Sequence, residues 1–450
     1  MVGVARNALP PGPRTPAALN MLRFMRAPIE TLLGWQARYG NVFSVRYAGF
    51  GTGVYVAEPD AIRTLFTGDQ SDLLAGEANS FMTPVVGPSS VLVLDGREHM
   101  RQRKLLLPPF QGSRVASFRE TIREVAEAEV AGWTAGRRLV IRERMRALTF
   151  EVICRAVFGV TERARVERLR VALGAVLDSS PVFMLSSALR ADLGPLSPGG
   201  RFARRLAAAD AAIAEEIELR RRAEDLGERT DVLSLLLQAR DEDGASMSDS
   251  ELRDELFTML GAGHETTATG LAFAFELLLR NPAVLERLRE EIETGADDAY
   301  LDAVVKETLR LRPIIDGAER TLTKPRWVAG WELPAGAKVY PGILLVHMRE
   351  DLYPEPERFR PERFAEEGAE SYAWLPFGGG IRRCIGAALA QAEMAEVLRA
   401  AIPAVELRTL RPEPDPVRIR GITLAPSRGV EVEVERRLMR QTPRVSTVAA

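Results

Sequence analysis

Residues 377–386 read Phe-Gly-Gly-Gly-Ile-Arg-Arg-Cys-Ile-Gly and place Cys384 in a glycine-rich loop, directly after two arginines. A thiolate is stabilised by backbone N–H groups that point at sulfur and by nearby positive charge. Glycines let a backbone approach a bulky group closely, because they carry no Cβ. The loop is therefore predicted to present one sulfur anion to something large and flat.

A second unusual stretch lies at 261–268, which reads Gly-Ala-Gly-His-Glu-Thr-Thr-Ala. It falls in the middle of a helix predicted over 248–280, which starts with the capping-box pattern Ser-Asp-Ser-Glu and stops before Asn281-Pro282. Glycine and threonine are poor helix formers, and a threonine hydroxyl can bond a carbonyl one turn earlier. We expect a kink or groove here, with polar groups inside.

Two other known motifs resemble residues 261–268, but each lacks a residue that the motif requires. His264-Glu265 resembles the start of a zinc-protease H-E-x-x-H, but position 268 is alanine, so the second ligand is missing. Gly261 and Gly263 resemble a dinucleotide loop, yet no predicted strand precedes them and Thr266 replaces the third glycine. A kinked core helix without chemistry stays open as an alternative.

Three weaker patterns accompany these two. Glu307 and Arg310 form an i,i+3 pair, which by itself favours a solvated helix face. Residues 359–364, Phe-Arg-Pro-Glu-Arg-Phe, read as a turn with aromatic side chains. His99 and Arg103 share one face of a locally basic helix that also carries Arg101 and Lys104, and a solvated basic face is the alternative.

Composition excludes several classes of protein. The chain has 450 residues, 46% hydrophobic and 27% charged, with a formal net charge of −2, so nothing points to a nucleic-acid or anionic-membrane partner. Only two cysteines occur, which favours a reducing compartment, and Cys154 lies in an apolar helical pattern typical of a buried structural thiol. No charge-free run approaches the ~20 residues of a membrane span. We expect a soluble cytoplasmic protein without a membrane anchor.

The remaining elements must position these groups within a single domain over 1–450. We expect a proline-rich extended lead-in (1–20), a hairpin (41–58) and a mostly helical region (96–240). Further helices should follow at 282–294 and 300–311, and short strands at 318–340 and 405–435. An irregular connector (351–376) separates the two groups of strands, and a flexible tail (437–450) ends the chain.

The order of the motifs along the chain resembles the cytochrome P450 family over nearly the whole length. The cysteine motif matches at Phe377, Gly380, Arg382, Cys384 and Gly386, and the oxygen-activation motif at Ala262, Gly263, Glu265, Thr266 and Thr267. Glu265 replaces the aspartate found in many bacterial members. The resemblance implies a mainly α fold with small β-sheets, shaped as a triangular prism, with haem between the long central helix and the helix after the cysteine loop.

The resemblance also implies the roles of individual residues. Cys384 would be the axial ligand of a haem b iron, a ligation that favours O–O cleavage. Thr266 and Glu265 would deliver the protons that dioxygen cleavage requires. The haem propionates would contact His99, Arg103, Arg320 and Arg382, and the rest of the haem would contact Phe377, Gly378, Gly386 and Ala262. Glu307, Arg310 and Arg363 would be structural.

The implied reaction inserts one oxygen atom of O2 into a hydrophobic small molecule, such as a terpenoid, fatty acid or polyketide. Asp316 is a candidate for recognising an amine or hydroxyl, and His264 either reaches the substrate or faces away. The substrate would contact residues that are all apolar: Phe81, Met82, Val86, Phe183, Met184, Ile314, Ile315 and Ile422.

Electrons would come from a ferredoxin or flavodoxin with its reductase, because no redox segment is appended to this chain. A basic patch of Arg101, Lys104 and Arg383 would receive that donor on a monomeric protein. Two other functions stay open. One is a peroxide-using or redox-neutral haem-thiolate enzyme, which the intact Glu265-Thr266 pair disfavours. The other is a non-catalytic haem-binding protein.

Overall fold

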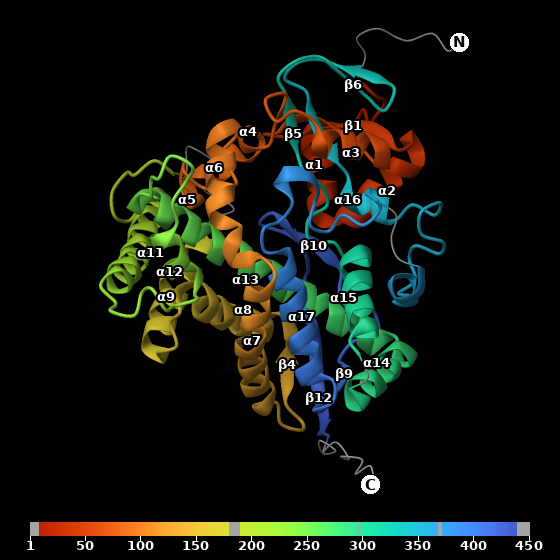
Figure 1. Ribbon diagram of the computed structural model, residues 1–450. Coiled ribbons are helices and arrows are strands. Elements are labelled where there is room, and N and C mark those ends of the chain that lie inside the picture. The colour runs from red at the N-terminus through yellow and green to blue at the C-terminus, as the bar shows by residue number, and fades with distance from the viewer. Residues whose placement is uncertain (1–8, 180–189, 296, 368–370, 439–450) are drawn as a thin grey trace, which may run out of the picture.

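The computed structural model describes residues 9–179, 190–295, 297–367 and 371–438. Most of the described chain is helical, and the strands form small sheets, which confirms the expected fold class. The larger sheet and the helices of residues 17–67 lie at one end of the molecule, and the last described strand, residues 431–437, lies at the opposite end (Figure 1). Helix α13 crosses the middle of the molecule between these two ends.

The α-helices of the described residues differ widely in length, and α13 is the longest at 32 residues. They are α1 (Ala17–Arg26), α2 (Pro28–Tyr39), α3 (Pro59–Thr67), α4 (Gly76–Asn79), α5 (Thr83–Val86), α6 (Gly96–Leu106), α7 (Ser113–Ala131), α8 (Ile141–Phe158), α9 (Arg163–Leu177), α11 (Pro198–Arg221), α12 (Val232–Gln238), α13 (Asp249–Arg280), α14 (Pro282–Thr294), α15 (Ala299–Leu311), α16 (Ile343–His347) and α17 (Ala387–Ala401). Short 3-10 or π turns are η1 (Ser80–Met82), η2 (Pro108–Phe110), η4 (Arg363–Glu367) and η5 (Gly380–Arg382).

The strands form a five-stranded sheet in the order β1-β2-β8-β5-β3, a three-stranded sheet β4-β12-β9, and the pairs β10-β11 and β6-β7. All neighbours are antiparallel except β2 and β8. Their bounds are β1 (Val42–Tyr47), β2 (Gly51–Val56), β3 (Leu73–Leu74), β4 (Arg138–Val140), β5 (Arg320–Leu322), β6 (Arg326–Val328), β7 (Trp331–Leu333), β8 (Lys338–Pro341), β9 (Val405–Thr409), β10 (Val417–Arg420), β11 (Thr423–Pro426) and β12 (Glu431–Arg437).

The predicted hairpin, the predicted helices over 248–311 and both groups of strands are confirmed. Two boundaries were wrong. The lead-in ends earlier than predicted, because α1 already begins at Ala17, and the tail begins later, because Arg437 pairs with Val405 in the sheet. Before α1 the lead-in runs beside β1, where Ser44 donates from its backbone to Pro11 (3.0 Å) and from its hydroxyl to Pro10 (2.7 Å).

Helix α13 starts at the predicted capping box, in which Ser248 and Glu251 each bond the backbone of the other. The helix is continuous through 261–268. The predicted back-bonding is confirmed: the hydroxyls of Thr266 and Thr267 donate to carbonyls one turn earlier, at 2.5 Å and 3.0 Å. Gly263 serves close packing, since a Cβ there would lie 2.8 Å from Ile153 of α8.

Two hydrophobic clusters form the interior of the described residues. One fills the space among α7, α8, α13, α15 and α17, and the other lies between the five-stranded sheet and the helices α2, α3 and α16. Within the described residues, no single helix is long and apolar enough to cross a membrane; only α13 and α14 together, bent by 110° at their junction, reach that length and composition.

Candidate active site

The cysteine loop is held in a fixed shape by its glycines and by α3. Gly378 and Gly380 have positive φ angles of 65° and 62°, which side-chain-bearing residues rarely adopt. A Cβ on Gly380 would lie 1.9 Å from the carbonyl oxygen of Phe66, so only glycine fits. Cys384 donates its backbone N–H to the carbonyl of Phe377 (2.9 Å), which closes the loop.

The sulfur of Cys384 lies in mixed surroundings. Burial raises the pKa of the thiol, while a hydrogen bond from the Gly386 backbone and the charges of Arg383 and Arg103 lower it. The residue is exposed on the loop, and of the effects on the thiol pKa the loss of hydration is the largest. The sequence-based expectation of a favoured thiolate was therefore incomplete: local charge alone does not ionise this thiol, whereas a coordinated metal deprotonates a thiol outright.

Four predicted contacts of an anionic group converge near the loop. Burial lowers the pKa of His99 to about 3, and the charges of Arg382, Arg103 and Arg320 add to this effect. Burial also lowers the pKa values of Arg320 and Arg382 to about 10, and in Arg320 repulsion from Arg382 contributes. A buried group of like charges is costly without an anion, so the cluster is suited to bind carboxylates.

Unused donors in this cluster are consistent with the same conclusion. The Nε atoms of Arg320 and Arg382 are buried and have no hydrogen-bond partner among the described residues. Arg320 otherwise donates only to the Glu319 carbonyl (2.8 Å), and Arg103 to the Arg383 carbonyl (2.8 Å). Free guanidinium donors beside a glycine-rich cysteine loop fit a flat group that carries a metal at its centre and carboxylates at its edge.

Asp95 is a residue of this site that the sequence analysis missed. Its Oδ1 lies 2.6 Å from Nη2 of Arg382, and its two oxygens also accept the backbone N–H groups of Ala75, Gly76 and Glu77 at 2.8–3.0 Å. Asp95 directly precedes α6, where an aspartate usually caps its own helix. Its side chain caps the start of α4 instead, and no local sequence pattern indicates that partner.

Thr266 and Ala262 lie on an accessible side of α13, in a helix that is otherwise buried from 267 to 278. The Thr266 hydroxyl donates to the Ala262 carbonyl and keeps its oxygen free to accept a further hydrogen bond. The neighbouring Thr267 faces α17, where it bonds the fully buried carboxyl of Glu393, whose pKa burial raises strongly. Only the first threonine of the pair is thus accessible to a ligand.

Glu265 is held by two arginines of α8. Arg142, whose guanidinium is almost fully buried, contacts one carboxylate oxygen, and Nε of Arg146 lies 2.8 Å from the other. Burial lowers the pKa of Arg142 to about 10. Because the arginines lie more than 110 residues earlier in the chain, sequence spacing gave no sign of this contact.

His264 points in the same direction as Glu265. Its ring packs edge-on against Phe150 of α8 at a centroid distance of 5.5 Å, and Nδ1 bonds the Leu260 carbonyl at 2.7 Å. Burial lowers its pKa to about 4, so the ring is neutral near pH 7. His264 is thus buried against α8, whereas Thr266 lies on the accessible side of α13.

Glu307 and Arg310 form a buried pair, so the solvated-face interpretation was wrong. Neither side chain is exposed, and two N–H···O contacts of 2.6 and 2.8 Å join them. Arg363, from the connector, approaches the same carboxylate at 3.4 Å. Arg310 also donates to the His347 carbonyl (2.8 Å), so this group ties α15 to the segment that leads to the cysteine loop.

The predicted substrate contacts are distributed unevenly. Met82, Val86 and Ile314 are buried, Phe81 and Ile315 are partly accessible, and Ile422 is 46% exposed. The Ile314 carbonyl accepts the Leu424 N–H (2.8 Å), which brings two of the predicted segments together. Phe183 and Met184 lie outside the described residues.

The predicted basic patch was wrong for two of its three members. Arg101 lies 2.6 Å from Asp241 and 2.5 Å from Glu251, and Lys104 lies 2.6 Å from Glu242. These carboxylates neutralise the face of α6. Arg383 is exposed and has no ion pair among the described residues. The same is true of Arg63, whose guanidinium stacks on Tyr372 at 5.3 Å beside the same loop.

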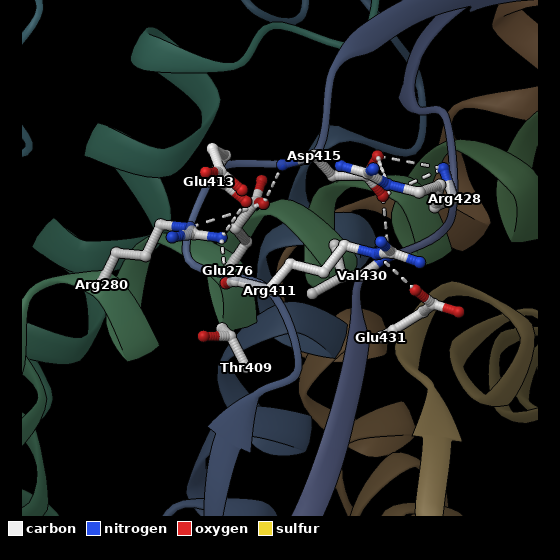
Figure 2. Close-up of a pocket in the computed structure, with 9 residues that line it drawn as sticks. All are labelled: Glu276, Arg280, Thr409, Arg411, Glu413, Asp415, Arg428, Val430 and Glu431. Atoms are coloured by element: carbon white, nitrogen blue, oxygen red, sulfur yellow. Dashed lines mark hydrogen bonds and ion pairs between the residues drawn. The ribbon is translucent and has the colours of Figure 1, made fainter.

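A separate pocket lies at the C-terminal end of α13 and does not belong to this site. Figure 2 shows its charged side chains paired with one another, including Arg411 with Glu431 at 2.8 Å and Arg428 with Asp415 at 3.2 Å. Its volume of about 20 Å³ holds one water at most. The described residues contain no group of three or more His, Cys, Asp or Glu side chains that could hold a metal ion.

Comparisons with known proteins agree with this geometry. The profile of the family described as Cytochrome P450 matches residues 10–430. Cytochrome P450 135B1 of Mycobacterium tuberculosis is 41% identical over 96% of this chain and 93% of that protein, and cytochrome P450 138 of the same organism is 36% identical over 95% and 97%. The solved structure of retinoic acid-bound cyanobacterial CYP120A1 is similar, with a TM-score of 0.81, 26% identity, and coverage of 95% of this chain and 99% of that one.

Proposed function

The chain belongs to the cytochrome P450 family, and we propose that it oxygenates a mainly hydrocarbon small molecule with electrons from a separate acidic redox protein. The general part of this function follows from the family, whose members are haem-thiolate monooxygenases that bind haem b through a cysteine. The substrate class, the donor and the roles of individual residues are the proposal.

The observation that carries the proposal is the position of Cys384 next to four basic groups. Cys384 would hold the haem iron, and His99, Arg103, Arg320 and Arg382 would hold its carboxylates. Two unpartnered guanidinium Nε atoms support this assignment. When bound, the haem supplies the activation of dioxygen, a chemistry that no side chain of this protein provides.

The proton path is assigned to α13. Thr266 holds its hydroxyl at an accessible surface, where it donates to the Ala262 carbonyl and its oxygen would accept a hydrogen bond, while Glu265 would bring protons from the direction of α8. Because Arg142 and Arg146 bind Glu265, its carboxylate must leave at least one of them to carry a proton. The delivery step is thus a side-chain movement as well as a proton transfer.

The substrate is assigned as largely apolar because the segments of the predicted pocket are apolar, apart from one acid. Asp316 has no ion pair among the described residues, and burial raises its pKa to about 6. A buried carboxyl without a charged partner favours a ligand that brings a hydroxyl or an amine. Asp316 would therefore orient a polar end of the substrate.

The electron donor is assigned to the surface around Arg63 and Arg383. Both are exposed and form no ion pair with the described part of the chain, and both lie beside the cysteine loop, which would give a short path to the haem. An acidic ferredoxin or flavodoxin complements two free arginines, and its association would slow as salt rises.

The reduced, carbon monoxide-bound protein tests the reaction class. Its Soret band should appear at the wavelength that names the family, and Cys384→Ala should abolish that band. Cys154→Ala is the matched control, because that thiol is fully buried within α8 and should not affect the spectrum. A band that survives Cys384→Ala would overturn the ligand assignment. Product formation with peroxide alone, and none with reductase and O2, would favour the peroxide-using enzyme.

A further inference from the structure

Residues 87–95 form a segment that is tied to α13 at one end. The Ser89 N–H donates to Oδ2 of Asp254 and the Val91 N–H to Oε1 of Glu255, each at 2.8 Å. Between them, the hydroxyls of Ser90 and Thr258 lie 2.7 Å apart. Three consecutive residues of the segment therefore contact one face of α13: Ser89 and Val91 through their backbone N–H groups, and Ser90 through its hydroxyl.

The other end of the same segment holds Arg382. Its guanidinium donates to the Val91 carbonyl at 3.2 Å and to the Leu94 carbonyl at 2.5 Å, and it pairs with Asp95 at 2.6 Å. Val91 thus accepts a bond from Arg382 with its carbonyl while its N–H is bound by Glu255. A single peptide segment connects the α13 carboxylates to a guanidinium of the basic cluster.

The end that contacts α13 is buried, which leaves little room for alternative hydrogen bonds there. Ser90 and Glu255 are 0% exposed and Asp254 is 4% exposed. Gly87 fixes the register where the segment begins: its φ is 87°, and a Cβ there would lie 2.0 Å from Oδ1 of Asp254. Another residue at this position would displace the carboxylate that binds Ser89.

The segment directly follows the apolar residues assigned to the substrate. Met82 and Val86 lie in η1 and α5, immediately before Gly87, and both are buried. Because the chain is continuous and tightly bonded from 87 to 95, a displacement of the segment changes the position of this apolar wall. The same displacement changes the carbonyls that orient Arg382.

We propose that Glu255 and Asp254 are positioning residues that fix the 87–95 segment, and through it both the apolar wall at Met82 and Val86 and the orientation of Arg382. The proposal rests on the proposed function, since it takes the wall as part of the substrate pocket and Arg382 as a haem contact. The proposal gives α13 a second role, in addition to proton delivery by Thr266 and Glu265. The helix would also position the apolar wall of the pocket and the Arg382 guanidinium at the haem edge.

The test compares Glu255→Leu with Glu255→Gln in the haem-loaded, full-length protein. Leucine removes the acceptor for the Val91 N–H, whereas glutamine keeps an oxygen of the same reach. The probes are imidazole, which reports on the iron alone, and 4-phenylimidazole, whose ring also contacts the pocket wall; both are followed by the shift of the Soret band. The reduction potential of the haem is the second readout.

We expect Glu255→Leu to weaken 4-phenylimidazole about tenfold relative to imidazole, as the loss of a buried hydrogen bond implies, and to shift the reduction potential. Glu255→Gln should restore both values. Glu276→Leu is the matched control, because Glu276 is also buried in α13 and accepts a backbone N–H, from Asp415 at 2.6 Å, near the other end of the helix. It should leave the ratio of the two affinities and the potential unchanged.

An unchanged affinity ratio and potential in folded Glu255→Leu would overturn the proposal. If that variant does not fold, the isosteric Thr258→Val removes the bond to Ser90 together with the local bond of the Thr258 hydroxyl to the Asp254 carbonyl. It should shift the ratio in the same direction, and no shift would overturn the proposal equally. Failure of the haem assignment, the part of the proposed function on which this proposal rests, is distinguishable, because the unmodified protein would then show no Soret shift with either azole.

Discussion

Nε of Arg146 lies 2.8 Å from Oε2 of Glu265, so the acidic residue of the oxygen-activation motif is anchored on α8. Arg142 contacts the other carboxylate oxygen from a buried position. The two guanidinium groups together bind both oxygens of this carboxylate. They also restrain its movement.

Glu265→Gln is expected to lower the rate of product formation roughly 10²-fold, because the amide cannot relay a proton. Binding of substrate should change little, since Glu265 faces α8. The measurement is product formation under saturating donor, together with the solvent isotope effect, which should rise. Glu143→Gln is the control: it removes the same charge from an exposed position on α8 and should leave both quantities unchanged.

Thr266→Ala should uncouple electron use from product formation. Without the hydroxyl at the accessible side of α13, proton delivery is misdirected, so electron consumption continues while product falls and hydrogen peroxide accumulates. Thr266→Ser keeps the hydroxyl that donates to the Ala262 carbonyl and should preserve coupling. Equal coupling in the alanine and serine variants would contradict the role given to Thr266.

Glu307→Ala is expected to destabilise the protein by about 3–5 kcal/mol, because it leaves the buried guanidinium of Arg310 without its carboxylate. Thermal and urea denaturation, with yield of soluble haem protein, would measure the effect. Glu167→Ala breaks another i,i+3 pair, with Arg170, in which both side chains are about half exposed. It should not move the denaturation midpoint, as expected for surface pairs.

The stability of the protein should depend on pH through Glu255. Burial, with smaller contributions from Asp254 and Glu251, raises its folded-state pKa from 4.5 to about 8, although the Val91 N–H opposes the shift. Between these values the folded state binds a proton that the unfolded chain has released. The free energy of unfolding therefore falls as pH rises from about 4.5 to about 8 and then levels off.

Glu255→Gln removes this contribution, so the difference in unfolding free energy between the natural protein and the variant isolates it from other buried acids. That difference should decrease over the same pH range, measured as urea midpoints at several pH values. A difference that is constant with pH, or that grows, would show that Glu255 is already ionised in the folded protein.

Local sequence patterns predicted the fold well where the interaction that produces the structure joins residues close together in the chain. The capping box at Ser248 and the Asn281-Pro282 stop define both ends of α13, and the alternation around 41–58 defines the hairpin, because these signals act within a few residues. The cysteine and oxygen motifs likewise marked two parts of the site directly.

What the sequence could not predict is the identity of distant partners. The i,i+3 spacing of Glu307 and Arg310 is compatible with a surface, and only the packing of α15 under the connector buries it. Arg101 and Lys104 read as free cations until carboxylates from 241–251 fold onto them. Asp95, Arg142 and Glu255 were missed because each acts on a residue more than 100 positions away.

The contact between Gly380 and the Phe66 carbonyl has a consequence for protein engineering. The backbone of the cysteine loop lies directly against the backbone of α3, so a side chain introduced at 380 would push the loop and α3 apart. Arg63 and its stacking partner Tyr372 would move with that helix. If Cys384 and Arg63 have the roles proposed above, a substitution intended to tune the cysteine loop would then also alter the proposed surface for the electron donor, and the two properties would have to be optimised together.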